Sequence, residues 1–306
     1  MAIQEVDYIW KNGELVPWHE CTTHVLTHSL HYGSGVFEGI RCYYNEETGK
    51  SYVFRLQEHM ERLIRSCKIA LIDIDYTAEE LCEATLEVIR ANKLPSCYIR
   101  PLVYRGYGNM GVNPAGCPTE VIIAVWPWGA YLGDDALENG VSVGVSSWRQ
   151  RSVNAIPPAM KSTASYMNSI LAKMEALEHG YAEAILLNED GKVCEGSGEN
   201  LFVVRNGVLS TPPLSDGVLE GITRDTVLCI AEDLDIPALE ESLVRSDLYV
   251  ADEVFMTGSA AELTPIGAVD GRTIGKPGEI TKAIQAKFFD IVSGKEEAYL
   301  DWLTEV

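Results

Sequence analysis

The sequence predicts an α/β protein built from two domains, and three observations support this. With 306 residues the chain is long for one hydrophobic core and long enough for two. Strand-like runs and runs with helical periodicity alternate along its whole length. A segment with glycine, proline and two aspartates, residues 127–135, separates the halves. We therefore expect an N-terminal domain at 1–127, an interdomain loop at 128–138 and a C-terminal domain at 139–306.

In the first half, apolar residues recur at helical spacing over Leu56–Ala70. Glu80 completes a capping box with Thr77 at the start of a second helix. Short runs with asparagine and glycine are typical of hairpin turns. The expected elements are turns at Asn12-Gly13 and Asn45–Gly49, helices over Leu56–Ala70 and Thr77–Asn92, and strands over Cys97–Tyr104 and Glu120–Trp126.

The second half is predicted to mix strands with three helices. Gly180 stands where a glycine commonly ends a helix. The expected elements are strands over Val141–Trp148, Ala184–Asn188 and Asn200–Arg205, turns at Asp190-Gly191 and Asn206-Gly207, and helices over Ser165–His179, from about Thr223, and over Glu279–Val292. The first of these helices carries Met167, Ile170, Leu171, Met174 and Leu177 on one face, and the second is expected to turn Val227, Ile230, Ala231 and Leu234 inward.

The charge and the cysteines argue against several classes of protein. A net charge of −21 and a pI near 4.6 repel nucleic acid and anionic membranes. None of the eight cysteines forms a C-x-x-C pair, so neither a metal site nor a redox disulfide is expected. The longest apolar run, Val121–Trp126, is too short to span a bilayer, and Met1–Trp10 lacks the pattern of a signal peptide. Free thiols favour a reducing, cytoplasmic location.

Two residues are candidates for chemistry. Lys161 has apolar or small neighbours in Ile156–Thr163, and desolvation lowers the pKa of a lysine and makes its amine nucleophilic. Glu195 lies among small residues in Val193–Asn200, where glycine lets a flat ring approach closely. Taken singly, the first is more typical of a surface lysine before a helix and the second of a solvated hairpin.

Three further segments could contact a small ligand. Gly221–Asp225 begins a predicted helix, where free N–H groups and the Thr223 hydroxyl suit a phosphate. Thr257–Glu262 places small residues at a strand end, where backbone donors can meet an anion. Tyr32–Arg41 spaces glycines among aromatic residues, as in the wall of a ligand site. Taken singly, the first is more typical of an N-cap without a ligand, and the alternatives for the other two are a turn and a glycine-bearing strand and bend.

Together these five segments resemble the class IV, or fold-type IV, aminotransferases that use pyridoxal 5'-phosphate (PLP), and within them the branched-chain amino acid aminotransferases. The resemblance covers nearly the whole chain and includes Phe54-Arg55, Tyr98–Pro101, Met110–Pro114, Trp128–Gly133 and Ala251–Glu262. The chain departs from many relatives in two places. Many relatives carry glycine or asparagine within the segment that is Ser162–Ser165 here, and many carry threonine at the position of Ser259. The resemblance implies a small α/β N-terminal domain and a larger C-terminal domain of pseudo-barrel type.

The resemblance also implies roles for individual residues. Lys161 would hold PLP as a Schiff base, Glu195 would pair with the pyridine nitrogen, and Tyr166 would contact the phenolic oxygen. The phosphate would be bound by Arg55, Ile222, Thr223 and Ser259, with Leu219 against the ring. The substrate pocket would be formed by Phe37, Gly39, Arg41, Tyr98, Arg100, Trp128, Tyr131, Ser259 and Ala260, with Tyr32 and Val112 from a neighbouring subunit.

The implied reaction is reversible transfer of the amino group of L-leucine, L-isoleucine or L-valine to 2-oxoglutarate. Its partners would be amino acids and 2-oxo acids, not nucleic acid or a membrane. The protein would be at least a homodimer, and a trimer of dimers stays open. Three alternatives share the fold: a D-amino-acid aminotransferase, an (R)-amine transaminase and aminodeoxychorismate lyase. Val36–Arg41 and Gly111–Pro114 favour the branched-chain type.

Overall fold

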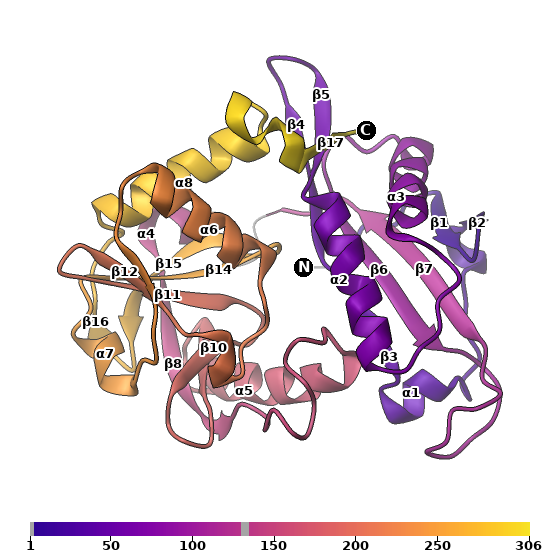
Figure 1. The fold of residues 1–306 in the computed structure, drawn as a ribbon, viewed down its shortest axis with the longest axis horizontal. Helices are drawn as coiled ribbons and strands as arrows, with labels where there is room; N and C mark the ends of the chain where they lie inside the picture. The colour runs from indigo at the N-terminus through magenta and orange to yellow at the C-terminus, as the bar shows by residue number, and fades with distance from the viewer. Residues whose placement is uncertain (1–2, 130–134) are drawn as a thin grey trace. The chain divides into compact units, whose positions relative to one another are not determined.

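The computed structural model describes residues 3–129 and 135–306. Within this range the chain divides into two compact units. Unit 1 comprises residues 3–129, 160–164 and 291–306, and unit 2 comprises residues 135–159 and 165–290. The sequence-based prediction assigns residues 160–164 and 291–306 to the C-terminal domain. The position of the domain boundary remains a prediction. Figure 1 labels the helices and strands.

Unit 1 is built on one antiparallel sheet of eight strands among the described residues. Its order is β17-β5-β4-β6-β7-β1-β2, with β3 paired to β6. Both hairpins expected from the sequence are confirmed, at Asn12-Gly13 and at Asn45–Gly49. The strands are β1 Tyr8–Lys11, β2 Glu14–Pro17, β3 Gly35–Phe37, β4 Ile40–Asn45, β5 Lys50–Phe54, β6 Cys97–Arg105, β7 Thr119–Trp126 and β17 Leu303–Glu305.

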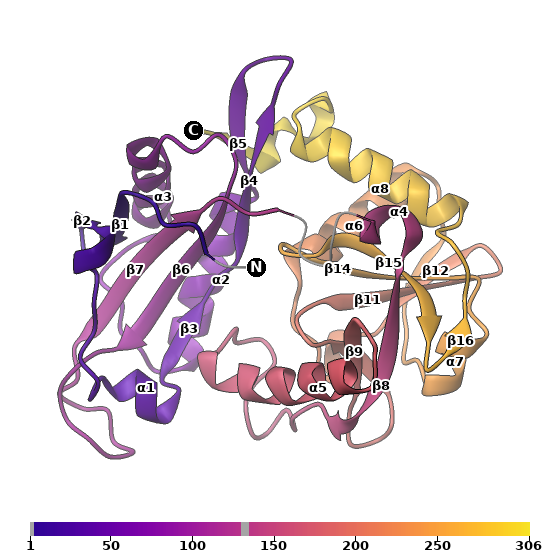
Figure 2. The same cartoon turned by 180° about the vertical axis from the view of Figure 1, so that it is seen from behind.

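Two long helices, α2 (Leu56–Ile69) and α3 (Ala78–Asn92), cover one face of this sheet, as Figures 1 and 2 show from opposite sides. The apolar side of α2 packs into the core of unit 1. Thr77 and Glu80 form the predicted capping box at the start of α3. The shorter helices of this unit are η1 Trp18–Glu20, α1 His28–Tyr32 and η4 Glu297–Trp302.

Unit 2 contains a mixed sheet of nine strands among the described residues, in the order β10-β9-β8-β15-β14-β11-β12-β13 with β16 paired to β15. Strand β8 runs parallel to both of its neighbours, β9 and β15. The strands are β8 Val141–Arg149, β9 Glu183–Leu187, β10 Val193–Gly196, β11 Asn200–Arg205, β12 Val208–Thr211, β13 Ala238–Glu240, β14 Glu253–Gly258, β15 Glu262–Val269 and β16 Arg272–Thr273.

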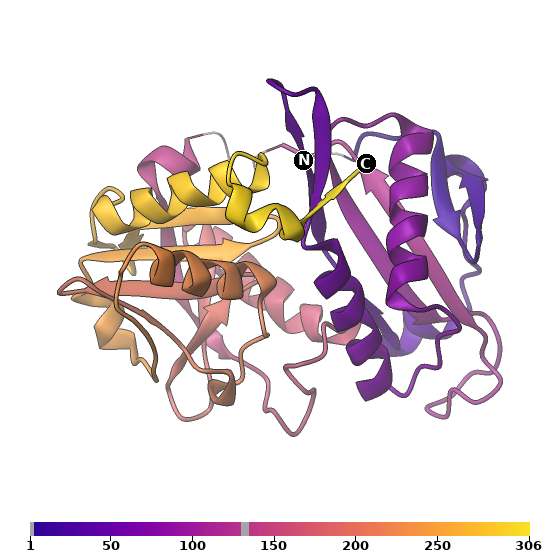
Figure 3. The ribbon, with the colours of Figure 1, turned by 45° about the horizontal axis from the view of Figure 1, so that its top comes forward.

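The helices of unit 2 are α4 Ala136–Asn139, α5 Tyr166–Glu178, η3 Leu214–Asp216, α6 Ile222–Asp233, α7 Arg245–Tyr249 and α8 Glu279–Val292; η2 (Thr163–Ser165) precedes α5. Gln285 of α8 donates to the Leu263 carbonyl at 2.8 Å, and Figure 3 shows α8 lying along the strands. Val227, Ile230 and Ala231 face inward as predicted. The prediction for Leu234 is wrong: it is 36% exposed, because the helix ends one residue before it.

Helix α5 buries its small residues and exposes its large ones. Ala172 and Ala176 pack against Ala184 and Leu186 of β9. The predicted apolar face is present, but it lies at the surface of the chain, where Met167, Ile170, Leu171, Met174 and Leu177 are each more than one-third exposed. A contiguous exposed apolar stripe marks an interaction surface more often than a solvated one.

The described residues include no helix with the length and apolar character needed to cross a bilayer. All eight cysteines are free thiols in the structure, and five of them are buried. Burial raises the pKa of the Cys67 thiol to about 12, and burial together with neighbouring acids does the same for Cys194. Such thiols are unreactive, in keeping with a packing role.

Candidate active site

Lys161 lies in a short segment that pairs with unit 1. Its N–H donates to Ser66 Oγ at 3.3 Å, and its carbonyl accepts from the Phe37 N–H at 3.0 Å. The next residue, Ser162, forms an antiparallel bridge with Val36 in β3. The backbone of the lysine is therefore bound on both sides, and its side chain extends from a fixed base.

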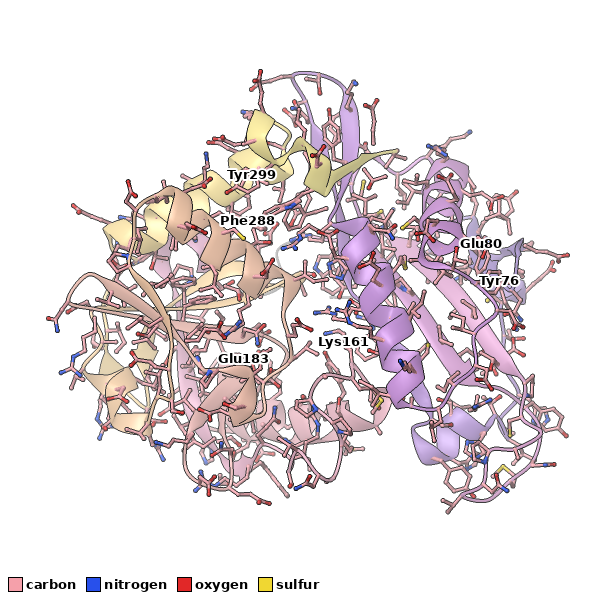
Figure 4. The ribbon with its side chains drawn as sticks, in the orientation of Figure 1. Tyr76, Glu80, Lys161, Glu183, Phe288 and Tyr299 are labelled. Carbon is pink, nitrogen blue, oxygen red and sulfur yellow. The ribbon has the colours of Figure 1, made fainter. Side chains whose placement is uncertain are left out.

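The Lys161 amine lies 5.3 Å from the centre of the Phe37 ring, and Figure 4 labels it beside α2. Burial lowers the pKa of His59 on α2, and the positive charges of Arg62 and Lys161 lower it further against the effect of Glu38. Lys161 therefore shares one electrostatic environment with a buried cluster that the sequence analysis did not single out.

Strands β4 and β6 bring aromatic and cationic side chains together. Arg41 pairs with Tyr98 in the register of these strands. The Arg100 guanidinium lies 4.6 Å from the centre of the Phe37 ring and donates to the Tyr98 hydroxyl at 3.3 Å. The Trp128 ring packs 5.1 Å from the Tyr98 ring. Within unit 1 the fold thus brings five predicted pocket residues together.

Gly39 is required by the position of Tyr98. A Cβ at residue 39 would overlap the Tyr98 hydroxyl and would lie 3.0 Å from the ring carbon that carries it. No side chain larger than hydrogen fits unless Tyr98 moves. The predicted role of Gly39 in shaping the pocket thus has a steric basis within unit 1.

Tyr32 of unit 1 binds Gly111, the residue before Val112, and both Tyr32 and Val112 are exposed. The Tyr32 hydroxyl accepts from the Gly111 N–H at 3.2 Å, and His28 Nε2 lies 2.8 Å from the Gly111 carbonyl. Tyr32 is 43% and Val112 is 89% exposed. Side chains presented in this way are available to a second chain.

Arg55 occupies an unusual backbone position at the start of α2, with a φ of 50°. Its Nε donates to Glu58 at 2.8 Å, and its guanidinium stacks 4.4 Å from the centre of the Trp302 ring. Trp302 also accepts the Arg55 N–H through its carbonyl at 2.7 Å. The C-terminal segment of the chain thus holds this arginine in place.

In unit 2, Glu195 lies on β10 with both carboxylate oxygens bound. Gln150 Nε2 donates to Oε1 at 2.5 Å and the Leu219 N–H donates to Oε2 at 3.0 Å. Gln150 also donates to the Gly217 carbonyl at 3.2 Å. The carboxylate is therefore fixed by two donors, and one of them, Gln150, escaped sequence analysis because it stands 45 residues away.

The start of α6 presents the predicted phosphate-binding residues in unit 2. Gly221 is its N-cap, and a Cβ there would overlap the Asn200 side chain. Asn200 in turn donates to the Leu219 carbonyl at 3.0 Å. Thr223 and Ile222 follow in the first turn, where helix N–H groups lack carbonyl partners within the helix. The loop that carries Leu219 is thereby fixed against β11.

Ser259 and Ala260 follow β14 directly, in the tight connection to β15. Residue Asn200 pairs with Thr257 in the register of β11 and β14, and a Cβ on Gly258 would lie 3.5 Å from the Gly198 carbonyl. Residues 198–200 and 257–260 therefore lie at the same edge of the sheet. Tyr166 begins α5, and Tyr131 lies outside the described residues.

A buried acidic cluster lies in the same unit. Burial, with the negative charge of Glu183, raises the pKa of Glu199 to about 8. Glu183 is fully buried and binds the Lys173 amine at 2.6 Å. Glu195 contributes a further negative charge that raises the pKa of Glu199. The sequence offered no signal for this cluster, because glutamates in a hairpin are usually solvated.

Three comparisons relate the chain to known proteins. The profile of the family described as amino-transferase class IV matches residues 35–269. The branched-chain-amino-acid aminotransferase of Escherichia coli (strain K12) is 49% identical over 309 residues, covering 100% of this chain and 99% of that protein.

The fold agrees with solved structures of the same kind. The crystal structure of the Escherichia coli branched-chain amino acid aminotransferase matches with a TM-score of 0.95 and 50% identity, covering 98% of this chain and 99% of that one. The branched-chain amino acid aminotransferase from Thermobaculum terrenum, in its PLP-bound holo form, matches with a TM-score of 0.93 and 37% identity over 98% of each chain. The α/β class with a pseudo-barrel second sheet is confirmed, and the chain belongs to the class IV aminotransferases and, within them, to the branched-chain amino acid aminotransferases.

Proposed function

We propose that this chain is an aminotransferase that moves the amino group of L-leucine, L-isoleucine or L-valine reversibly to 2-oxoglutarate, with PLP as cofactor. The observation that carries the proposal is full-length identity of 49% to a branched-chain-amino-acid aminotransferase. The two residues on which the chemistry depends, Lys161 and Glu195, both have firmly held surroundings.

The donor set of this chain fits PLP. A lysine amine matches the aldehyde, a carboxylate matches the pyridine nitrogen, and hydroxyls and N–H groups at a helix start match the phosphate. Glu195, half-buried and held by Gln150 and Leu219, presents a fixed negative charge. Gly221, the N-cap of α6, leaves room for the Asn200 side chain that binds the Leu219 carbonyl. When bound, PLP supplies an electron sink for the substrate α carbon.

Lys161 would serve as anchor and as proton shuttle. Its amine would hold the cofactor covalently between turnovers, and after substrate displaces it, Nζ would take the α proton and return it. Glu195 would favour the protonated pyridine nitrogen through its opposite charge. Tyr166 would donate to the phenolic oxygen, and Leu219 would pack on the ring.

The phosphate would be bound by Ile222, Thr223, Ser259 and an arginine. The sequence prediction names Arg55, whose guanidinium is engaged by Glu58 and Trp302. Arg62, whose Nε and Nη2 bind Glu38, is a second candidate, because it lies one helical turn from Ser66, which accepts the Lys161 N–H. PLP affinity of Arg55→Gln and Arg62→Gln variants would separate the two, since the true phosphate ligand loses the larger share of binding.

The substrate pocket would combine apolar walls with cations. Phe37, Tyr98, Trp128, Tyr131 and Ala260 would accommodate a branched side chain, whereas Arg41 and Arg100 would bind carboxylates. Arg100 is poised for this role, stacked on Phe37 and bound to the Tyr98 hydroxyl. A missing methylene changes binding by only about 1–3 kcal/mol, so all three branched substrates should be accepted.

The exposed residues support a homodimer. The apolar stripe of α5 is solvent-exposed in the single chain, and Tyr32 and Val112 project from unit 1. We propose that α5 packs against a second chain and that Tyr32 and Val112 close the partner's substrate pocket. A trimer of dimers stays open. The free cysteines favour a cytoplasmic location.

The decisive experiment incubates the PLP-loaded protein with L-leucine and 2-oxoglutarate and follows glutamate. Borohydride reduction and peptide mapping should place the cofactor on Lys161, and Lys161→Ala should lose both label and turnover. Dominant activity on D-alanine or an (R)-arylamine would replace the proposed substrates. Pyruvate release without an amino acceptor would indicate a lyase instead.

A further inference from the structure

Helix α2 carries a buried polar stripe beside its apolar face. His59, Arg62 and Ser66 recur at helical spacing, and none of them is more than 4% exposed. Burying polar groups costs free energy unless each finds a partner. The hydrogen-bond partners of these three side chains therefore indicate why the stripe is buried.

The first partner is Lys161 itself. Ser66 Oγ accepts the Lys161 N–H at 3.3 Å, while the Phe37 N–H binds the Lys161 carbonyl at 3.0 Å. Thr163 continues the attachment by donating to the carbonyls of Gly33 and Gly35 at 3.0 and 3.1 Å. The lysine thus sits in a segment bound by α2 on one side and by β3 on the other.

The second partner is Glu38, the residue after Phe37. Its fully buried carboxylate binds Arg62 Nε and Nη2, each at 2.8 Å, and His59 Nδ1 at 2.8 Å. Burial alone would raise the pKa of Glu38, yet the charge and hydrogen bonds of Arg62 and the hydrogen bond of His59 hold that pKa well below its usual range. Burial lowers the pKa of His59, and its Nδ1 donates to the Glu38 carboxylate.

We propose that this polar stripe, acting through Ser66 and Glu38, is a positioning device that sets the backbone of Lys161 and thereby the reach of its amine. Ser66 fixes the lysine N–H directly. Glu38 fixes the end of β3, and with it the Phe37 N–H that holds the lysine carbonyl. Neither residue touches the reacting atoms, so both are positioning residues.

This inference rests on the proposed function, which requires the Lys161 amine to be held in a fixed position. The amine must serve as covalent anchor and as proton shuttle, and a displacement of about 1 Å can cost roughly 100-fold in rate. A flexible four-carbon side chain can meet both demands only from a base that does not shift. Hydrogen bonds with α2 and with β3 supply that base.

The test compares Ser66→Ala with Thr85→Val in the PLP-loaded protein. Thr85 is equally buried in unit 1, but its hydroxyl donates to the Leu81 carbonyl within its own helix, α3. Each change removes one buried hydrogen bond, so both should destabilise the protein by a similar amount. Only Ser66→Ala should speed amide hydrogen exchange in peptide 160–164, by about 5-fold, weaken the visible circular dichroism per bound PLP, and lower kcat for L-leucine while KM stays constant.

Equal exchange and equal circular dichroism in the two variants would overturn the proposal. If Ser66→Ala does not fold, Glu38→Gln provides a second test, because it keeps the side-chain volume and removes the negative charge that Arg62 and His59 bind. The same changes are expected in this variant. Their absence would equally refute the proposal. Borohydride trapping in the unmodified protein separates the two claims. A label absent from Lys161 contradicts the proposed function, whereas a normal label with unaffected variants contradicts only the positioning role.

Discussion

At the scale of single residues, the candidate active-site residues are held by neighbours that lie far from them in the sequence. Gln150 and the Leu219 N–H hold Glu195, Ser66 holds the Lys161 backbone, and Tyr98 fills the space beside Gly39. Each contact joins residues of ordinary type. Only the folded chain brings them together.

Gly39→Ala should destabilise the protein by about 1–3 kcal/mol, because the new Cβ overlaps the Tyr98 hydroxyl. Tyr98→Phe removes that hydroxyl. The double variant Gly39→Ala/Tyr98→Phe should therefore recover most of the loss, as measured by denaturant unfolding. Additive losses in the double variant would show that the overlap is not the cause.

Glu199 should make stability depend on pH. Its folded-state pKa of about 8 lies above the ordinary value of 4.5, so between these pH values the native carboxyl keeps a proton that the unfolded chain has lost. The contribution is fully present below pH 4.5 and is lost as pH rises to about 8, at up to about 1.4 kcal/mol per pH unit. Glu199→Gln should flatten the fall in unfolding free energy across this window.

The exposed carboxylate Glu178 on α5 provides the control for that measurement. Glu178→Gln should keep the slope of the unmodified protein, because its side chain is solvated in both states. An unchanged slope in Glu199→Gln would mean that Glu199 is ionised in the folded protein.

At the scale of elements, α5 has one face that packs against unit 2 and another that is exposed and apolar. Its alanines pack on β9, whereas its large apolar residues lie exposed. The alanines and the large apolar residues both recur at helical spacing. The pattern therefore predicts a helix but does not show which of its two faces packs against unit 2.

Ile170→Glu/Met174→Glu should dissociate the proposed dimer, because both residues are about half exposed in the single chain and a charge there would be buried by a partner. A loss of at least 2 kcal/mol, roughly 30-fold in Kd, is expected by sedimentation. Glu232→Lys, which changes an exposed acid on α6 instead of α5, should have little effect. A monomeric parent protein at micromolar concentration would contradict the assignment of this surface.

At the scale of the whole molecule, the net charge of −21 implies self-repulsion that the folded state must tolerate. Salt screens such charges, with a Debye length near 10 Å at 0.1 M. Raising NaCl from low concentration to 0.5 M should therefore increase Tm by a few degrees, roughly 3 °C per kcal/mol. A fall in Tm would show that attractive ion pairs outweigh the repulsion.

The sequence by itself determined the α/β class, the order of helices and turns, and the candidate residues Lys161 and Glu195 with the segments around them. These features are local: periodicity, caps such as Thr77–Glu80, and short motifs in a set order each lie within a few residues of chain. The same local signals misplaced Leu234, because a pattern does not state where the last turn ends.

Only the tertiary structure decided what surrounds those residues. Ser66 stands 95 residues from Lys161, and Gln150 stands 45 from Glu195, so no window along the chain contains either pair. Burial raises the pKa of both buried carboxyls, Glu38 and Glu199, but Arg62 brings the pKa of Glu38 well below its usual range, whereas Glu183 raises the pKa of Glu199 further. Burial and neighbouring charge set a pKa, and folding alone chooses both.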